Sequence, residues 1–136
     1  MEQYTQSLIA EGKSPQNFGE LQGATDHKTR HNMFCGDTIH VHIQRDGESL
    51  NACTFTGRGC LLCMASASFM TQWVRGQHLS TVQHLIQRMI STHDMKDMEY
   101  MPEFLHMMEL MDARTIAGRS MCVKLPWLAL QDILAR

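Results

Sequence analysis

Two neighbouring stretches in the N-terminal half of the chain alternate between apolar and polar residues. In residues 38–44 every second position is a branched aliphatic residue, and residues 49–57 resume a strand-like pattern after the Asp-Gly pair at 46–47. Alternation with a period of two is typical of strands that bury one face, and Asp-Gly favours a tight hairpin turn. The pattern therefore predicts an antiparallel hairpin with one face open to solvent. A ragged edge strand is expected around residues 27–33.

After Gly59 the apolar residues recur with the spacing of three and four positions that is typical of helices. Gly76 ends the first of these stretches, and Ser80-Thr81 is expected to cap the second. Pro126 fits the first turn of a final helix, because a residue there needs no hydrogen-bond partner for its N–H. Residues 113–121 are predicted to be a connection. The expected helices, including a short N-terminal one, cover residues 1–12, 60–76, 82–90, 104–111 and 125–136.

Strands first and helices afterwards predict the α+β class, with a small antiparallel sheet packed on one face by several helices. A length of 136 residues suits one domain, so residues 1–136 are expected to form a single unit. The apolar fraction of 43% is high enough to build a core.

Charge and hydropathy argue against two broad classes of partner. Twelve Lys and Arg against fourteen Asp and Glu give a net charge of −2, without the basic stripe that nucleic-acid binding requires. No run approaches 18 apolar residues, so a membrane-spanning helix is not expected. The N-terminus lacks the basic and apolar regions of an export signal. We therefore expect a soluble, cytoplasmic protein with neither nucleic-acid nor membrane partners.

The five cysteines are an odd number, so a complete disulfide framework explains them poorly. Cys35, Cys60 and Cys122 lie at the ends of predicted elements, where side chains from separate segments can meet. With Asp37 they would supply three thiolates and one carboxylate, a tetrahedral set suited to zinc or to one side of an iron–sulfur cluster. The alternative for each cysteine is burial as a small apolar residue, which is favoured for Cys53.

Three ordered motifs carry a family resemblance. They are CGD at 35–37, GRGCLLCMASASFM at 57–70 and MCVKLPWLAL at 121–130. Together they resemble the U-type iron–sulfur assembly proteins, and SPQNFG at 14–19 is similar to a further segment of that family. The three cysteines stand 25 and 62 positions apart. The long second gap, the absence of an LPPVK stretch and the methionine before the last cysteine resemble the SufU branch rather than the IscU branch.

This resemblance implies an α+β protein that binds a metal, zinc in SufU-like proteins, through Cys35, Asp37, Cys60 and Cys122. It implies a pyridoxal-phosphate (PLP)-dependent cysteine desulfurase of the SufS type as partner. Cys35 would be the catalytic acceptor of persulfide sulfur, so the chain would act as a zinc-dependent, sulfurtransferase-like protein. Apo iron–sulfur proteins or a downstream scaffold would receive the product. Arg119 matches the family's arginine three residues before the final cysteine. The alternative is a scaffold that holds iron or a transient 2Fe-2S cluster on the same ligands.

Several positions depart from the family pattern. Cys63 stands where serine is usual and forms Cys-x-x-Cys with Cys60. We expect it to be a buried small residue, with an extra ligand or a resolving thiol as alternatives. A redox dithiol of these two cysteines is therefore a third hypothesis for the whole protein. Gln16 replaces the usual arginine, and residues 11–13 also differ.

Two further features bear on metal chemistry. Gly57 and Gly59 are expected to let the backbone approach the metal without a Cβ in the way. His40 and His42 share one strand face at a spacing that can chelate a metal. A solvated outer face is favoured for them, because no third ligand lies nearby in the sequence.

Overall fold

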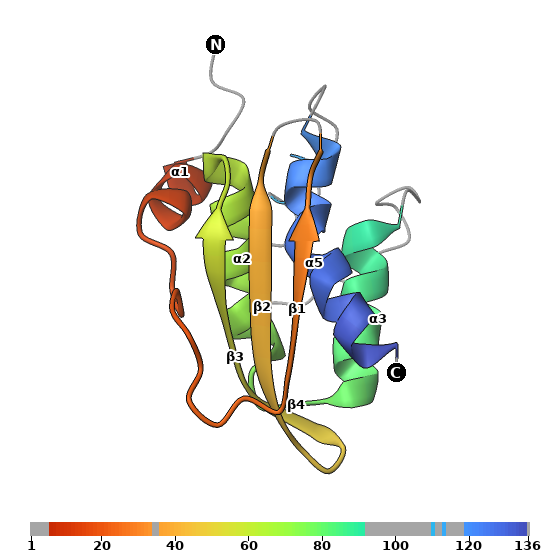
Figure 1. The fold of residues 1–136 in the computed structure, drawn as a ribbon. Coiled ribbons are helices and arrows are strands. Elements are labelled where there is room, and N and C mark those ends of the chain that lie inside the picture. Colours follow the sequence, from red (N-terminus) through yellow and green to blue (C-terminus); the bar gives the residue numbers. More distant parts are fainter. Residues whose placement is uncertain (1–5, 34–35, 92–109, 111–112, 114–118, 136) are drawn as a thin grey trace.

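The computed structural model describes residues 6–33, 36–91, 110, 113 and 119–135. In this part of the chain four strands form one antiparallel sheet in the order β1-β2-β3-β4. The strands are β1 (Asp26–His31), β2 (Thr38–Asp46), β3 (Ser49–Arg58) and β4 (Gln77–His78). The described helices are α1 (Gln6–Lys13), α2 (Leu61–Val74), α3 (Leu79–Ile90) and α5 (Ser120–Leu134) (Figure 1).

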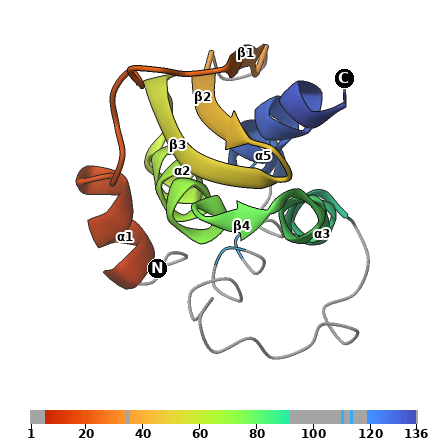
Figure 2. The same cartoon turned by 90° about the horizontal axis from the view of Figure 1, so that it is seen from below.

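Helices α2 and α5 pack against one face of the sheet, α3 packs against α5, and α1 lies beside α2 (Figure 1, Figure 2). The apolar side chains of the hairpin point into this helical layer, and Ile39, Val41, Ile43 and Phe55 have no exposed surface. Burying these side chains is the main driving force that holds the two layers together. The structure therefore confirms the predicted α+β architecture of a small antiparallel sheet with helices on one face.

The predicted hairpin and edge strand are confirmed as β2, β3 and β1. The two-residue strand β4 is an addition that the sequence pattern did not predict. It pairs through Leu50↔Gln77 and Ser49↔His78, and two residues are too few to show an alternation. The SPQNFG segment covers part of the β3 edge, because Gly19 N–H donates to Phe55 O at 2.8 Å.

The predicted boundaries of two helices are wrong. The helix α3 is capped by His78 rather than by Ser80-Thr81, since His78 Nδ1 accepts a hydrogen bond from Ser80 N–H at 3.1 Å. The expected helix at 104–111 lies outside the described residues, apart from Leu110. Residues 1–5 of the predicted N-terminal helix also lie outside them, and α1 covers the remainder of that prediction.

The final helix begins at Ser120, so part of the predicted connection is helical and Pro126 lies inside α5 instead of in its first turn. An interior proline lacks the N–H that would bond the carbonyl four residues earlier, at a cost of roughly 3 kcal/mol. Leu125 and Trp127 on either side of it are almost completely buried. Tertiary packing of these neighbours outweighs the local preference of proline for a helix start.

The outer face of the sheet is less open than the alternating pattern predicted. His42 on this face is only 9% exposed, because rings from β1 and β2 stack over it. Within the described residues, the helices are all too short or too polar to cross a membrane.

Candidate metal centre

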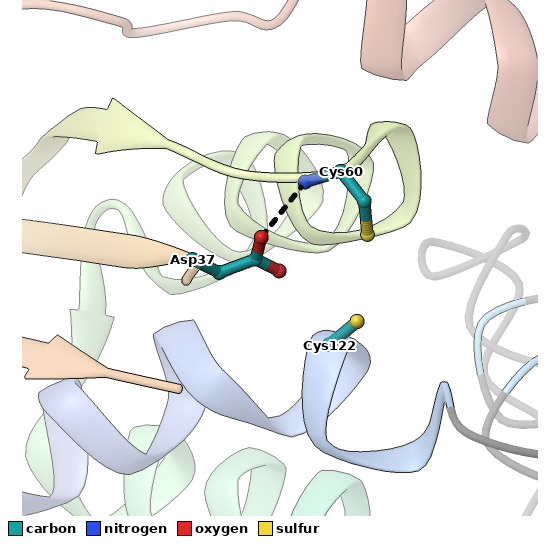
Figure 3. Close-up of side chains that lie close together, drawn as sticks. All are labelled: Asp37, Cys60 and Cys122. Atoms are coloured by element: carbon teal, nitrogen blue, oxygen red, sulfur yellow. Dashed lines mark hydrogen bonds between the residues drawn. The ribbon is translucent and has the colours of Figure 1, made fainter. Parts of the chain in front are cut away.

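Asp37, Cys60 and Cys122 converge at one end of the molecule from three separate elements (Figure 3). Asp37 directly precedes β2, Cys60 joins β3 to α2, and Cys122 lies in the first turn of α5, not before that helix as predicted. Their carboxylate and thiol ligand atoms all lie within 4.8 Å of one another. Asp37 and Cys122 are buried, whereas Cys60 is half-buried. The group therefore has one ligand that faces solvent.

Hydrogen bonds to the backbone fix the orientation of Cys60. It caps the N-terminus of α2, and its Sγ accepts from Cys63 N–H at 3.4 Å. Its own N–H donates to Asp37 Oδ1 at 3.2 Å. One carboxylate oxygen thus holds the turn that carries the thiol, so that Asp37 and Cys60 are positioned together.

A short backbone loop positions Asp37. Gly36 N–H donates to Asn32 O, and Asn32 N–H donates to Asp37 O, both at 2.8 Å. Gly36 has a φ of +76°, which an L-residue with a Cβ rarely adopts. The backbone that leads into β2 therefore places the Asp37 carboxylate near the N-terminal end of α2.

Close contacts surround both predicted glycines. A Cβ at Gly57 would lie 2.1 Å from Thr38 O, and Gly57 also has a φ of +139°. A Cβ at Gly59 would lie 3.1 Å from Cys63 Sγ and 3.2 Å from Asp37 Cγ. Gly59 therefore leaves space beside the candidate ligands, which agrees with the expected close approach of the backbone.

A buried network that the sequence analysis missed links the two helices that carry the cysteines. Ser66 Oγ in α2 donates to Val123 O in α5 at 2.6 Å and accepts from Trp127 Nε1–H at 3.1 Å. Ser66 and Trp127 have no exposed surface. Val123 directly follows Cys122, so this hydroxyl sets the distance between α2 and the Cys122 turn. The sequence signal for this network is Ser66 itself, a small polar residue among the small residues at 65–68.

The electrostatics of the group call for a cation. Asp37 Oδ2 is buried and has no hydrogen-bond partner among the described residues. Burial raises the pKa of the Cys122 thiol to about 12, with hydrogen-bond and charge effects of Cys60 and the charge of Asp37 adding to the shift. A hydrogen bond from Arg119 acts in the opposite direction. A buried carboxylate with one unpartnered oxygen beside two thiols is unfavourable unless a positive ion accompanies it.

The donor set fits zinc. Zinc–sulfur bonds of about 2.3 Å and zinc–oxygen bonds of about 2.0–2.2 Å place tetrahedral ligands about 3.5–3.8 Å apart. The observed upper limit of 4.8 Å is close enough for small side-chain rotations to complete the set. A bound divalent ion would also stabilise the thiolate forms of Cys60 and Cys122. Asp37, Cys60 and Cys122 are thus three candidate ligands in one place.

The remaining cysteines divide into two groups. Cys35 lies outside the described residues, so its predicted roles as ligand and sulfur acceptor stay predictions. Cys53 is buried in β3, and burial raises the pKa of its thiol to about 12, as expected of a packed residue. Cys63 is completely buried in the core and does not belong to the converging group. None of the four cysteines in the described part of the chain forms a disulfide bond.

Fold and site together define a class of protein: an α+β domain that gathers two thiols and a carboxylate, from the start of β2 and two helix N-termini, into a group that could hold a metal ion. The profile of the NifU-like N terminal domain family matches residues 3–118. The chain belongs to this family of iron–sulfur cluster assembly proteins, and the predicted resemblance is confirmed.

Two relatives span nearly the whole chain. The zinc-dependent sulfurtransferase SufU of Bacillus subtilis (strain 168) is 30% identical over 98% of this chain and 90% of its own length. The iron–sulfur cluster assembly scaffold protein IscU of Thermotoga maritima is 24% identical over 98% of this chain and 93% of its own length. The higher identity to the SufU relative agrees with the predicted branch.

Solved structures share the fold. The N-terminal part of a nitrogen-fixing NifU-like protein from Brucella abortus superposes with a TM-score of 0.84 at 18% identity, over 96% of this chain and 91% of that one. A protein from Fervidobacterium islandicum AW-1, described as a cluster assembly scaffold for the SUF system, gives a TM-score of 0.80 at 21% identity. The match covers 97% of this chain and 96% of that one.

Proposed function

We propose that this chain accepts persulfide sulfur from a PLP-dependent cysteine desulfurase of the SufS type, at a zinc site formed by Cys35, Asp37, Cys60 and Cys122, and that residues 1–136 act as one domain. The observation that carries the proposal is the convergence of three of these side chains with a buried, unpartnered carboxylate oxygen. The name of the B. subtilis relative, a zinc-dependent sulfurtransferase, supports the same reaction class.

Transfer requires a thiolate that attacks the outer sulfur of the desulfurase persulfide. The Cys35 thiolate would form a new S–S bond to that sulfur, while the bond to the desulfurase cysteine breaks and this cysteine leaves as a thiolate. Zinc, when bound, keeps the coordinating thiols deprotonated at neutral pH. Asp37 is the hardest of the four donors and binds zinc less strongly than sulfur does. The set therefore contains one exchangeable ligand next to the proposed acceptor, from which only Gly36 separates it.

The first test is the metal content of protein purified anaerobically without added metal. We expect about one zinc ion per chain and no labile sulfide. The second test combines the protein with a SufS-type desulfurase and measures cysteine turnover and the persulfide mass on the chain. Cys35→Ala should keep the fold and abolish sulfur acceptance.

Cys63→Ser is the matched control, because it removes a neighbouring buried thiol outside the converging group. It should bind zinc and accept sulfur as the unchanged protein does. Normal stimulation of the desulfurase by Cys35→Ala would refute the proposed role. Loss of function in Cys63→Ser with retention in Cys35→Ala would instead support the dithiol hypothesis.

A second candidate function is a scaffold that assembles a transient 2Fe-2S cluster on the same residues and passes it to apo-proteins. The partial exposure of Cys60 favours it, since a cluster must be released to a recipient, and the T. maritima relative is named as such a scaffold. Purified protein with iron, labile sulfide and visible absorbance in place of zinc would support this candidate.

A further inference from the structure

Three histidines meet on the outer face of the sheet, opposite to the helices. In the register of β1 and β2, His27 lies directly across from His42, and His40 follows on the same face two positions from His42. The ring centroids of His40 and His42 are 4.4 Å apart, and those of His27 and His40 are 5.0 Å apart. Strand pairing thus supplies the third imidazole that the sequence around His40 and His42 lacks.

The nearest pair of ring nitrogens has the spacing of two ligands on one ion. His27 Nδ1 and His40 Nε2 face each other at 2.9 Å. Two nitrogens about 2.0–2.1 Å from an ion and at a right angle to each other lie about 2.9 Å apart, whereas tetrahedral ligands lie about 3.3 Å apart. Right-angled nitrogen ligands suit nickel(II) and copper(II). An ion would lie about 2 Å from each nitrogen and off the line that joins them, so it would replace their hydrogen bond after both rings turn toward it.

His42 adds a third imidazole and an unpartnered nitrogen. Its side chain is nine-tenths buried, and its Nε2 has no hydrogen-bond partner among the described residues. The His27 and His42 ring centroids are 6.2 Å apart, so His42 would complete the set only after its ring turns about its side-chain torsions toward the pair. A ring nitrogen without a partner is costly to bury, and coordination would remove that cost.

Two of the three rings are accessible from solvent. His27 is exposed and His40 is half-buried. Both line an open cleft of about 370 Å³ between the start of β1 and β2, which Asp26 and Lys28 also line. Asp26 pairs with Arg45 at 3.4 Å. A small hydrated ion can therefore reach the rings of His27 and His40.

We propose that His27, His40 and His42 form a second metal site, which binds a divalent late transition-metal ion through imidazole nitrogens. This site is distinct from the group of Asp37, Cys60 and Cys122. Its donors are nitrogens rather than sulfurs, and His40 lies roughly 10 Å along β2 from Asp37. A bound ion would also tie the edge strand β1 to β2.

The test uses Ni²⁺ as the probe and the full-length protein, without a polyhistidine tag and with its thiol group first loaded with zinc. Binding is measured by calorimetric titration at about pH 7.5, one unit above the usual pKa of a free imidazole. We expect Ni²⁺ to bind without release of zinc. His27→Gln and His40→Gln should each weaken binding at least about tenfold, as loss of a metal-site residue commonly does. His42→Gln should weaken it as well.

His31→Gln is the matched control, because His31 lies exposed on the same face of β1 and its Nδ1 contacts Thr38 Oγ1 at 3.0 Å instead of another ring. This variant should bind Ni²⁺ as tightly as the unchanged protein. The proposal is overturned if Ni²⁺ does not bind, if His40→Gln binds it unchanged, or if His31→Gln weakens it equally. Uptake of Ni²⁺ matched by release of zinc would also overturn it, since the ion would then occupy the thiol group.

Discussion

Ser66 is the residue whose removal tests most directly how the two cysteine-bearing helices are held together. Ser66→Ala deletes a hydroxyl that donates to Val123 O and accepts from Trp127 Nε1–H. Val123 O keeps its helical partner four residues later, but the indole N–H is left buried without one. A buried donor without a partner costs about 1–3 kcal/mol, and the lost bond to Val123 adds about 0.5–1.5 kcal/mol. Together these terms predict a destabilisation of about 1.5–4.5 kcal/mol.

That free energy corresponds to a large shift in the midpoint of thermal unfolding. The unfolding entropy of a chain of this length is about 0.3 kcal/mol/K, so Tm should fall by about 5–15 °C. Urea denaturation followed by circular dichroism gives the same difference as a change in midpoint with an unchanged slope. Zinc affinity should fall as well, because the Ser66 hydroxyl contacts the residue that follows Cys122.

A double-mutant cycle distinguishes the orphaned indole from a simple loss of packing. Trp127→Phe removes the N–H, so adding Ser66→Ala to it leaves no unsatisfied indole donor. In that background the cost of Ser66→Ala should fall below about 1.5 kcal/mol. Equal costs in the two backgrounds, or a Tm change of less than about 2 °C for Ser66→Ala alone, would refute the assigned network.

Three more outcomes follow from other contacts. Gly57→Ala should lower the free energy of unfolding, measured by urea denaturation, by about 3 kcal/mol or more, because its Cβ would meet Thr38 O and its φ is positive. Gly47→Ala is the control: its φ is also positive but the space around it is open, so it should cost only about 1 kcal/mol. Asp37→Asn should weaken zinc binding at least about tenfold, yet raise or leave unchanged the Tm measured with chelator, since the substitution removes a buried charge whose Oδ2 has no partner among the described residues; a lower Tm in chelator would contradict this. The pKa of His42 is lowered by burial and by the charges of its neighbouring histidines, against an opposing carboxylate. The unfolded chain therefore binds more protons, and stability should decline as pH falls below about 6.5; Tm against pH for His42→Gln should decline less steeply.

Local patterns were sufficient for the secondary structure of the hairpin and of α2. Alternation and helical spacing are properties of neighbouring residues, so they predicted β2, β3 and the helix that starts after Cys60 within one or two positions. They failed for α5, where Pro126 indicated a helix start but lies inside the helix. Burial of its neighbours in the core is a long-range effect that no local pattern contains.

The sequence by itself determined which residue types are available for metal chemistry, and their motifs identified the family. Only the tertiary structure decided which of them meet. It placed Asp37, Cys60 and Cys122 together and left Cys63 in the core. It also brought His27 next to His40, thirteen positions away, because the register of an antiparallel pair, and not distance along the chain, determines which side chains share a face.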